Sequence, residues 1–253
     1  MILGAQLYSI RTYCQNERDF RESMRRIAQI GYTTVQISGV GPMKPEVIRS
    51  ICDENGLQIV LTHTNPDRVL NDTENVIREH DILGCDYIGI GSMPDRYRSA
   101  VWIDRFANDY TEPAKKIADS GKLLMYHNHN FEWEHIGKNT TLFDVLLESM
   151  PAELMGVTLD TYWVQAAGAD VISTIDRLAD RIPCVHLKDM TVKGMQQRYA
   201  PVGDGNLDFH RILSHLKELD KTKYMLVEQD DCYGEDPFAC LARSHDYVKA
   251  MKA

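Results

Sequence analysis

Residues 156–187 read GVTLDTYWVQAAGADVISTIDRLADRIPCVHL. Gly156–Leu159 and Cys184–Leu187 are short apolar runs of the length of a buried strand, and Val171–Ala179 between them repeats its apolar residues at helical spacing. A strand, a helix and a second strand in this order are typical of two parallel strands joined by a crossover helix. The segment therefore predicts one repeating unit of a parallel α/β fold.

The same alternation continues in both directions along the 253 residues. Helical periods separate the apolar runs, and glycines such as Gly31, Gly84 and Gly121 mark the ends of several helices. Eight strand–helix units with no linker between them predict an α/β protein that folds as one (β/α)8 TIM barrel domain over residues 1–253. The predicted strands are Leu3–Leu7, Thr34–Ile37, Gln58–Leu61, Tyr87–Ile90, Lys122–Tyr126, Gly156–Leu159, Cys184–Leu187 and Tyr224–Val227.

A doubly wound open sheet is the alternative fold. That fold carries a glycine-rich phosphate-binding loop after its first strand. Here the first strand runs into Gln6-Leu7-Tyr8-Ser9-Ile10-Arg11, which contains no glycine. The barrel is therefore favoured.

The composition is that of an acidic globular protein. The chain has 28 Lys and Arg against 37 Asp and Glu, a net charge of −9, which disfavours a nucleic-acid binder because such a protein needs a basic face. No apolar stretch reaches the roughly 18 residues of a membrane span, and the N-terminal residues do not resemble an export signal. We therefore expect a cytoplasmic protein with its six cysteines reduced and with no nucleic-acid or membrane partner, while the sequence allows a homo-oligomer.

Polar residues gather where the predicted strands end, which is where (β/α)8 barrels carry their chemistry. Mixed His, Asp and Glu ligands without a thiolate suit one divalent ion such as Mn²⁺, Mg²⁺, Co²⁺ or Zn²⁺. The sequence therefore predicts a metal site formed by the ends of strands five to eight. The candidate ligands are His127, His129 and Glu132 after strand five, and Asp160, His186 and Glu228 at the ends of the next three strands.

Each of these residues also has a structural interpretation when it is taken alone. Asp160 suits the N-cap of the following helix. His186 suits a hydrogen-bonded core histidine, and Glu228 suits an ion pair with Lys188. The metal site is favoured because the residues fall on consecutive strand ends.

Four further residues at or just beyond strand ends are candidates for substrate binding. Gln6 and His63 end the first and third strands and offer hydrogen bonds. Trp133 and Trp163 lie just beyond strands five and six, where an aromatic ring provides a wall for a sugar. Core packing is the alternative for both tryptophans.

Five segments of the chain carry a family resemblance. They are Tyr126–Trp133 (YHNHNFEW), Leu159–Trp163 (LDTYW), Val185–Asp189 (VHLKD), Pro201–Gly205 (PVGDG) and Glu228. Together they resemble the sugar phosphate isomerase/epimerase family of xylose-isomerase-like TIM barrels, and the resemblance covers the whole chain. It implies one divalent ion held through strands five to eight, and Asp160, His186 and Glu228 match the last three ligands of that family.

The first ligand departs from the family pattern. In the ketose epimerases of the family a glutamate ends strand five, whereas this chain has His127 there and Glu132 five residues later. We expect Glu132 to fold back to the metal because it keeps a site of hard oxygen ligands, and His127 is the alternative ligand. With Glu132 as the ligand, His127 and His129 face the substrate.

The resemblance implies a metal-dependent isomerase or epimerase that acts on a sugar or cyclic polyol. A metal-polarised carbonyl acidifies the neighbouring C–H bond. Glu228 is then the expected base, with His127 or His129 as its partner and with Lys188 stabilising the developing oxyanion.

Three other functions are weighed against this one. The ketose epimerases use a glutamate on each face of the sugar, and only one is evident here, which weighs against a simple epimerase. The main alternative is a metal-dependent lyase or dehydratase that acts on a keto-cyclitol or keto-sugar, because elimination starts with the same proton abstraction and the sequence does not separate the two. A non-catalytic sugar-binding barrel is less favoured because the set of candidate ligands is complete. An endonuclease-like phosphodiesterase is less favoured because of the acidic charge.

Overall fold

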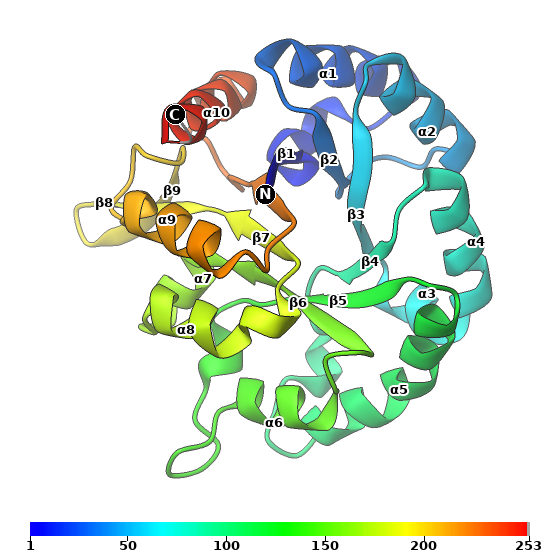
Figure 1. Cartoon of the computed structure of the whole chain (residues 1–253), viewed down its shortest axis with the longest axis vertical. Coiled ribbons are helices and arrows are strands. Elements are labelled where there is room, and N and C mark those ends of the chain that lie inside the picture. Colours follow the sequence, from blue (N-terminus) through cyan, green and yellow to red (C-terminus); the bar gives the residue numbers. More distant parts are fainter. Residues whose placement is uncertain (252–253) are drawn as a thin grey trace.

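The computed structural model describes residues 1–251 and contains a closed barrel of eight parallel strands (Figure 1). The order around the barrel is β1-β10-β7-β6-β5-β4-β3-β2, so strands that follow one another in the barrel also follow one another along the chain. The predicted (β/α)8 fold is therefore confirmed. The barrel strands are β1 (Ile2–Gln6), β2 (Thr34–Ile37), β3 (Gln58–Thr64), β4 (Tyr87–Ile90), β5 (Leu123–His127), β6 (Met155–Asp160), β7 (Cys184–Leu187) and β10 (Tyr224–Val227).

Helices surround the barrel, and capping residues mark where several of them begin and end (Figure 1). The Asn16 side chain accepts the backbone N–H of Asp19 at the start of α1, and Gly31 ends this helix with a φ of 111°. Apolar residues at helical spacing then bury one side of each helix against the strands. The α-helices are α1 (Glu17–Ile30), α2 (Pro45–Glu54), α3 (Pro66–Asn71), α4 (Thr73–Leu83), α5 (Ile103–Asp119), α6 (Leu142–Ser149), α7 (Thr161–Ala166), α8 (Val171–Leu178), α9 (Phe209–Leu219) and α10 (Pro237–Met251), and the 3-10 helices are η1 (Leu7–Tyr13), η2 (Asp95–Tyr97), η3 (Phe131–Trp133) and η4 (Ala179–Arg181).

Some strands extend further into the polar segments than the apolar runs predict. β5 includes His127, which pairs with Thr158, and β6 includes Asp160, which pairs with His186. Pairing within the barrel therefore holds the backbone of these polar residues in regular strand geometry. This places their side chains on rigid elements and not on loops.

A two-stranded antiparallel hairpin, which the sequence pattern did not predict, follows β7. It consists of β8 (Asp189–Lys193) and β9 (Gln196–Ala200). The Asp189 carboxylate accepts the backbone N–H groups of Gly203, Gly205 and Leu207. A Cβ on Gly205 would lie 2.3 Å from Asp189 Oδ1, so only glycine allows this approach. The Pro201–Gly205 segment is therefore anchored to the base of the hairpin.

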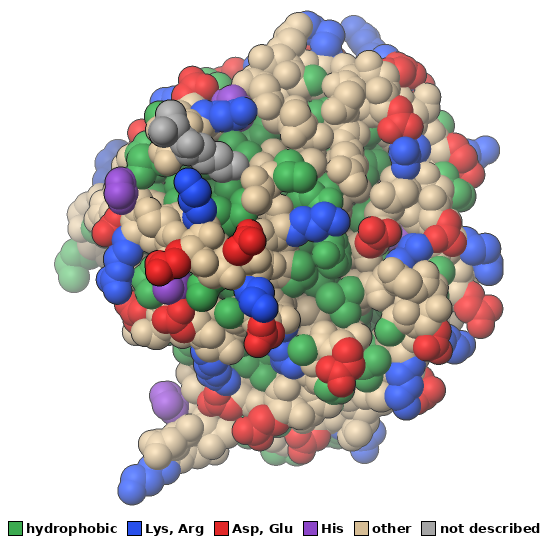
Figure 2. Space-filling model, viewed as in Figure 1, with side chains coloured by type: hydrophobic (Ala, Val, Ile, Leu, Met, Phe, Trp, Pro, Cys, Tyr) green, Lys and Arg blue, Asp and Glu red, His purple; other side chains and the backbone are tan. Residues whose placement is uncertain are grey.

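Basic and acidic side chains are interspersed on the face of the molecule shown in Figure 2. This mixture differs from the continuous basic surface that a nucleic-acid binder presents. Within residues 1–251, no helix is both long and apolar enough to cross a membrane.

Candidate active site and metal centre

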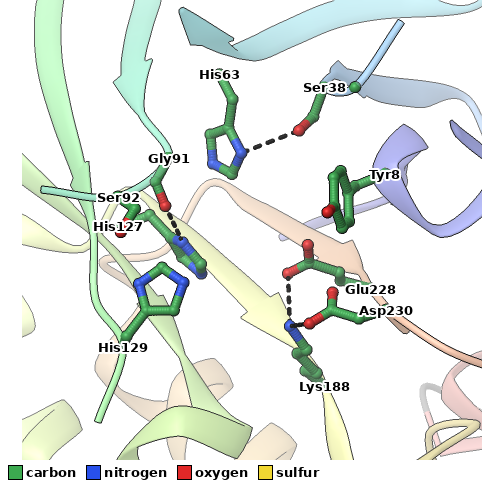
Figure 3. Close-up of a pocket in the computed structure, with 11 residues that line it drawn as sticks. Tyr8, Ser38, His63, Gly91, Ser92, His127, His129, Lys188, Glu228 and Asp230 are labelled. Atoms are coloured by element: carbon green, nitrogen blue, oxygen red, sulfur yellow. Dashed lines mark hydrogen bonds and ion pairs between the residues drawn. The ribbon is translucent and has the colours of Figure 1, made fainter. Parts of the chain in front are cut away.

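A cavity of about 350 Å³ lies at the carboxyl ends of the barrel strands. This is the end at which (β/α)8 barrels place their active sites, and the volume is in the range of small-molecule pockets. The side chains around it come from loops and strand ends that are far apart in the sequence (Figure 3). The cavity is lined by Tyr8, Ser38, Gly39, His63, Gly91, Ser92, His127, His129, Lys188, Glu228 and Asp230.

Four buried side chains form a candidate metal site at the base of this cavity. One ligand atom from each of His127, Asp160, His186 and Glu228 lies within 4.8 Å of the other three. His127 Nε2 lies 3.2 Å from Asp160 Oδ2, and His186 Nδ1 lies 2.9 Å from Glu228 Oε2. Two imidazole nitrogens and two carboxylate oxygens therefore converge on one point, which is a donor set that divalent transition metals accept.

Hydrogen bonds on the far side of each imidazole orient the two candidate histidine ligands. His127 Nδ1 lies 2.8 Å from the Gly91 carbonyl oxygen, and His186 Nε2 lies 2.6 Å from Gln36 Oε1. Since both partners are acceptors, these nitrogens carry the protons, and the lone pairs of His127 Nε2 and His186 Nδ1 point toward the carboxylates. Metal-binding histidines are commonly oriented in this way by a second hydrogen bond.

Each of the two carboxylates is also held through one oxygen while the other faces the cluster. Asp160 Oδ1 accepts the backbone N–H of Trp163 at 3.1 Å, and Glu228 Oε1 accepts Gln6 Nε2 at 2.8 Å. Asp160 is therefore both the N-cap of α7 and a candidate ligand, so the two interpretations of this residue are compatible. Glu228 Oε2 and His186 Nδ1 are both buried and face each other at 2.9 Å.

The electrostatics of the cluster favour a bound cation. Burial opposes the charged form of His186, but the adjacent Glu228 and Asp160 carboxylates outweigh it and raise the pKa of His186 to about 9. Positive charge is therefore favoured among these atoms, either as a proton on His186 or as a divalent ion that takes its place. The residues present therefore fit a divalent ion.

Glu132, which we expected to be the first ligand, does not lie in this cluster. Its carboxylate is fully buried and accepts the Tyr126 hydroxyl at 2.7 Å and the backbone N–H of His129 at 2.8 Å. The short helix η3 directs the side chain back toward β5 and away from Asp160. Our choice of Glu132 over His127 therefore needs correction, because the atom that completes the cluster is His127 Nε2.

The pH dependence of stability tests this placement of Glu132. Burial raises the pKa of Glu132 to about 7 from its ordinary 4.5, so the folded protein binds a proton that the unfolded chain has already released. This contribution to stability is complete below about pH 4.5 and is lost as the pH rises through about 7, with a total of roughly 3 kcal/mol at 1.4 kcal/mol per pH unit. Urea unfolding at pH 5 and pH 8 is expected to show a fall in the free energy of unfolding that Glu132→Gln largely removes. An equal fall in both proteins would contradict the buried, proton-binding role.

Lys188 brings a buried positive charge to the edge of the candidate metal site. Its Nζ lies 2.7 Å from Asp230 Oδ2, 3.5 Å from Glu228 Oε2 and 3.6 Å from Asp160 Oδ2. Burial works against the ammonium, but the three carboxylates outweigh it and raise the pKa of Lys188 above its usual range. Lys188 therefore remains charged and can donate hydrogen bonds to a substrate oxygen.

Histidines form the opposite wall of the cavity. Burial, together with the other histidines, lowers the pKa of His63 well below its ordinary value, and burial lowers the pKa of His129 to about 3. His63 Nδ1 hydrogen-bonds to Ser38 Oγ at 3.0 Å. Within the described part of the chain, His63 Nε2 and His129 Nδ1 are buried without a partner. These neutral imidazoles are suited to hydrogen-bond the hydroxyl groups of a ligand.

The structure brings some of the predicted substrate-binding residues to the cavity but not others. His63 lines it, whereas Gln6 lies beneath it and orients Glu228. The Trp163 ring lies 5.0 Å from the His129 ring, next to the cavity, and the Trp133 ring packs 5.0 Å from Phe143, in the core beside α6. The prediction that Trp133 forms an aromatic wall is therefore not supported by its position.

Several cavity residues were not identified from the sequence, and Tyr8, Ser38 and Asp230 are among them. Tyr8 and Ser38 follow β1 and β2 by two residues and by one residue, and Asp230 follows Glu228 by two residues. Their closeness to strand ends was the available signal. It was too weak because every residue of a βα loop shares it.

The fold and the site together define a (β/α)8 barrel with a candidate divalent-metal centre at the carboxyl ends of its strands. Residues 24–250 match the family model described as the xylose isomerase-like TIM barrel, and the chain belongs to this family. The family resemblance inferred from the sequence is thereby confirmed.

Comparison with individual proteins agrees with this assignment. An inosose dehydratase from Geobacillus kaustophilus is 24% identical over 90% of this chain and 84% of its own length. A sugar phosphate isomerase/epimerase from Parabacteroides distasonis has a similar structure, with a TM-score of 0.81, 21% identity and coverage of 98% of this chain and 93% of the other. An L-ribulose 3-epimerase superposes with a TM-score of 0.77 at 13% identity, covering 99% of this chain and 94% of the other. At these identities, the structural likeness establishes the fold.

Proposed function

We propose that this protein is a divalent-metal-dependent enzyme that removes a proton from the carbon next to the carbonyl group of a keto-cyclitol or keto-sugar, and that loss of water follows. The observation that carries the proposal is the distribution of charge around the cavity. Glu228, Asp230 and Lys188 lie on one side, and His63, His127 and His129 lie on the other (Figure 3). Acid–base chemistry is therefore concentrated on one face of the substrate.

The candidate metal site supplies the activation that this chemistry needs. A divalent ion held by His127, Asp160, His186 and Glu228 would act as a Lewis acid that polarises the carbonyl group of the substrate. The side chains of the chain account for the binding and proton-transfer steps.

Glu228 is the proposed base and Lys188 the proposed acid. The C–H bond next to the carbonyl breaks, the proton passes to Glu228 Oε2, and the electron pair forms a carbon–carbon double bond. As the C–O bond to the β-hydroxyl breaks, Lys188 donates a proton and water leaves. A proton then passes from Glu228 Oε2 to Lys188 Nζ, which lie 3.5 Å apart, and both side chains return to their starting protonation states.

The one-sided arrangement favours elimination over epimerisation. An epimerase removes a proton from one face and returns it to the other, which needs a base on each side of the substrate. The two carboxylates that line the cavity, Glu228 and Asp230, both lie on the Lys188 side of it, and the opposite wall carries none. The similarity to inosose dehydratases also supports elimination. Isomerisation or epimerisation of a sugar, our first expectation, shares the same initial step and is the second candidate.

Solvent deuterium incorporation tests the proposal. Mn²⁺-loaded protein in D₂O is incubated with a panel of ketoses, inososes and 3-keto-sugars, and products are followed by NMR and mass spectrometry. Deuterium exchange together with loss of water is the expected result, and wild-type protein stripped of metal is the control. Exchange without loss of water would indicate an isomerase or epimerase, and the absence of exchange with every substrate would contradict the proposal.

A further inference from the structure

A buried ammonium group lies beside two candidate metal ligands. Lys188 Nζ is 3.5 Å from Glu228 Oε2 and 3.6 Å from Asp160 Oδ2, and these oxygens are the ones that face the cluster. A lysine ammonium and a divalent cation compete for the same carboxylate oxygens, and they repel one another at this range. Metal binding at this site therefore depends on where Lys188 is held.

Asp230 is the carboxylate that lies nearest to the Lys188 ammonium. Its Oδ2 lies 2.7 Å from Nζ, which is shorter than the distance from Nζ to either candidate ligand. Arg11 Nη1 donates to the Asp230 backbone carbonyl at 3.0 Å. The loop that carries Asp230 is thus itself tied to a residue from the start of the chain.

Two aromatic rings also lie close to the ammonium. Nζ lies 5.1 Å from the centre of the Tyr199 ring and 5.2 Å from that of Trp163, within the range of cation–π attraction. These contacts leave Lys188 little freedom to move while Asp230 is present. Removing the Asp230 charge would release Nζ toward its two remaining anionic neighbours, Glu228 and Asp160.

We propose that Asp230 is a positioning residue that keeps the Lys188 ammonium away from the carboxylates of Asp160 and Glu228, so that both remain available to a divalent cation. This inference rests on the proposed function, because it assumes that the cluster binds a metal. It assigns to Asp230 an effect on metal affinity although Asp230 is not a ligand. It also explains how one cavity holds an ammonium and a divalent ion side by side.

A double-mutant cycle on Mn²⁺ affinity tests this inference. Isothermal titration calorimetry with Mn²⁺ alone compares the wild type, Asp230→Asn, Lys188→Met and the double variant. Asp230→Asn is expected to weaken Mn²⁺ binding about tenfold or more, because the ammonium then approaches the two carboxylates. In the Lys188→Met background the same change is expected to alter affinity by about twofold or less, because no ammonium remains to be displaced.

The cycle separates this effect from simple loss of a negative charge. An equal loss of affinity in both backgrounds would overturn the inference, since the Asp230 charge would then act on the metal directly. Asp231 lies in the same loop, and its carboxylate accepts the Tyr233 backbone N–H. Asp231→Asn is therefore the matched control, and it is expected to leave Mn²⁺ affinity unchanged. Circular dichroism melting shows whether each variant is folded, and Asp230→Glu provides a second variant that keeps the charge and is expected to retain affinity.

The outcomes also distinguish the inference from the proposed function. Wild-type protein that binds no Mn²⁺ would overturn both. Wild-type binding with no coupling between Asp230 and Lys188 would overturn the inference alone.

Discussion

Glu228→Gln is expected to lower solvent proton exchange about 10²- to 10⁴-fold, the range for loss of a general base. Glu228 Oε1 accepts Gln6 Nε2 at 2.8 Å, and a glutamine oxygen can keep that bond. The side-chain amide then takes the place of Oε2 next to His186 Nδ1, and an amide cannot accept a proton from the substrate. The variant should therefore fold and bind substrate while losing turnover. Deuterium exchange at saturating Mn²⁺ is the measurement.

Asp160→Asn is the matched control for Glu228→Gln. Asparagine is also a good N-cap, so the bond from the Trp163 backbone N–H to Oδ1 and the start of α7 should be preserved. The change then acts on the oxygen that faces the cluster, through metal occupancy, and excess Mn²⁺ should partly restore exchange. If saturating Mn²⁺ restores Glu228→Gln as fully as Asp160→Asn, Glu228 is only a ligand, and the base is to be sought at Asp230, the other carboxylate lining the cavity.

Removal of the metal is expected to abolish turnover, and Mn²⁺ or Co²⁺ should restore it. The same ion should stabilise the fold, because a ligand that binds only the folded state adds about 2.7 kcal/mol at 100 times its dissociation constant. For a chain of this length that corresponds to a rise of about 5–10 °C in the melting temperature. Activity and melting temperature are measured on protein treated with a chelator and then reloaded. Full activity in protein shown by elemental analysis to be metal-free would contradict the proposed metal dependence.

A pair of variants on either side of the turn after β5 shows which residue holds the ion. His127→Asn should lose most of the Mn²⁺-induced rise in melting temperature, because His127 Nε2 is one of the four converging atoms. Glu132→Gln should keep it, because the Glu132 carboxylate is bonded to Tyr126 and to the His129 backbone. The opposite result would restore our sequence-based choice of Glu132.

The parts of the site that were predicted from the sequence are those on the strands themselves. Asp160 and His186 each end a recognisable apolar run, and parallel strands in a closed barrel bring their carboxyl ends to one mouth. The ligands on β6, β7 and the end of β10 could therefore be proposed together before any contact was known.

The choice between His127 and Glu132 as the first ligand depends on a turn that the sequence pattern does not predict. Whether His127 or Glu132 reaches the cluster is decided by η3, which bends the chain after β5 and directs the Glu132 carboxylate toward the Tyr126 hydroxyl. A preference for hard oxygen ligands favoured Glu132, which lies outside the cluster, because that preference considered the chemistry of the ligand and not the path of the backbone. Asp230 was missed for a similar reason, since its role is set by contacts with Lys188 and Arg11 from elsewhere in the chain.

The sequence by itself determined the closed barrel, because the spacing of apolar residues is a local property that each strand and helix carries within its own segment. It also placed acidic and imidazole side chains at the strand ends. Only the tertiary structure decided which of them converge. The four ligand atoms that lie within 4.8 Å of one another come from β5, β6, β7 and the residue after β10, and their side-chain directions are held by Gln6, Gln36 and Gly91. These partners lie up to 222 positions away in the chain, so no local pattern encodes them. The position of the Lys188 ammonium is likewise set by groups that meet only in the folded barrel.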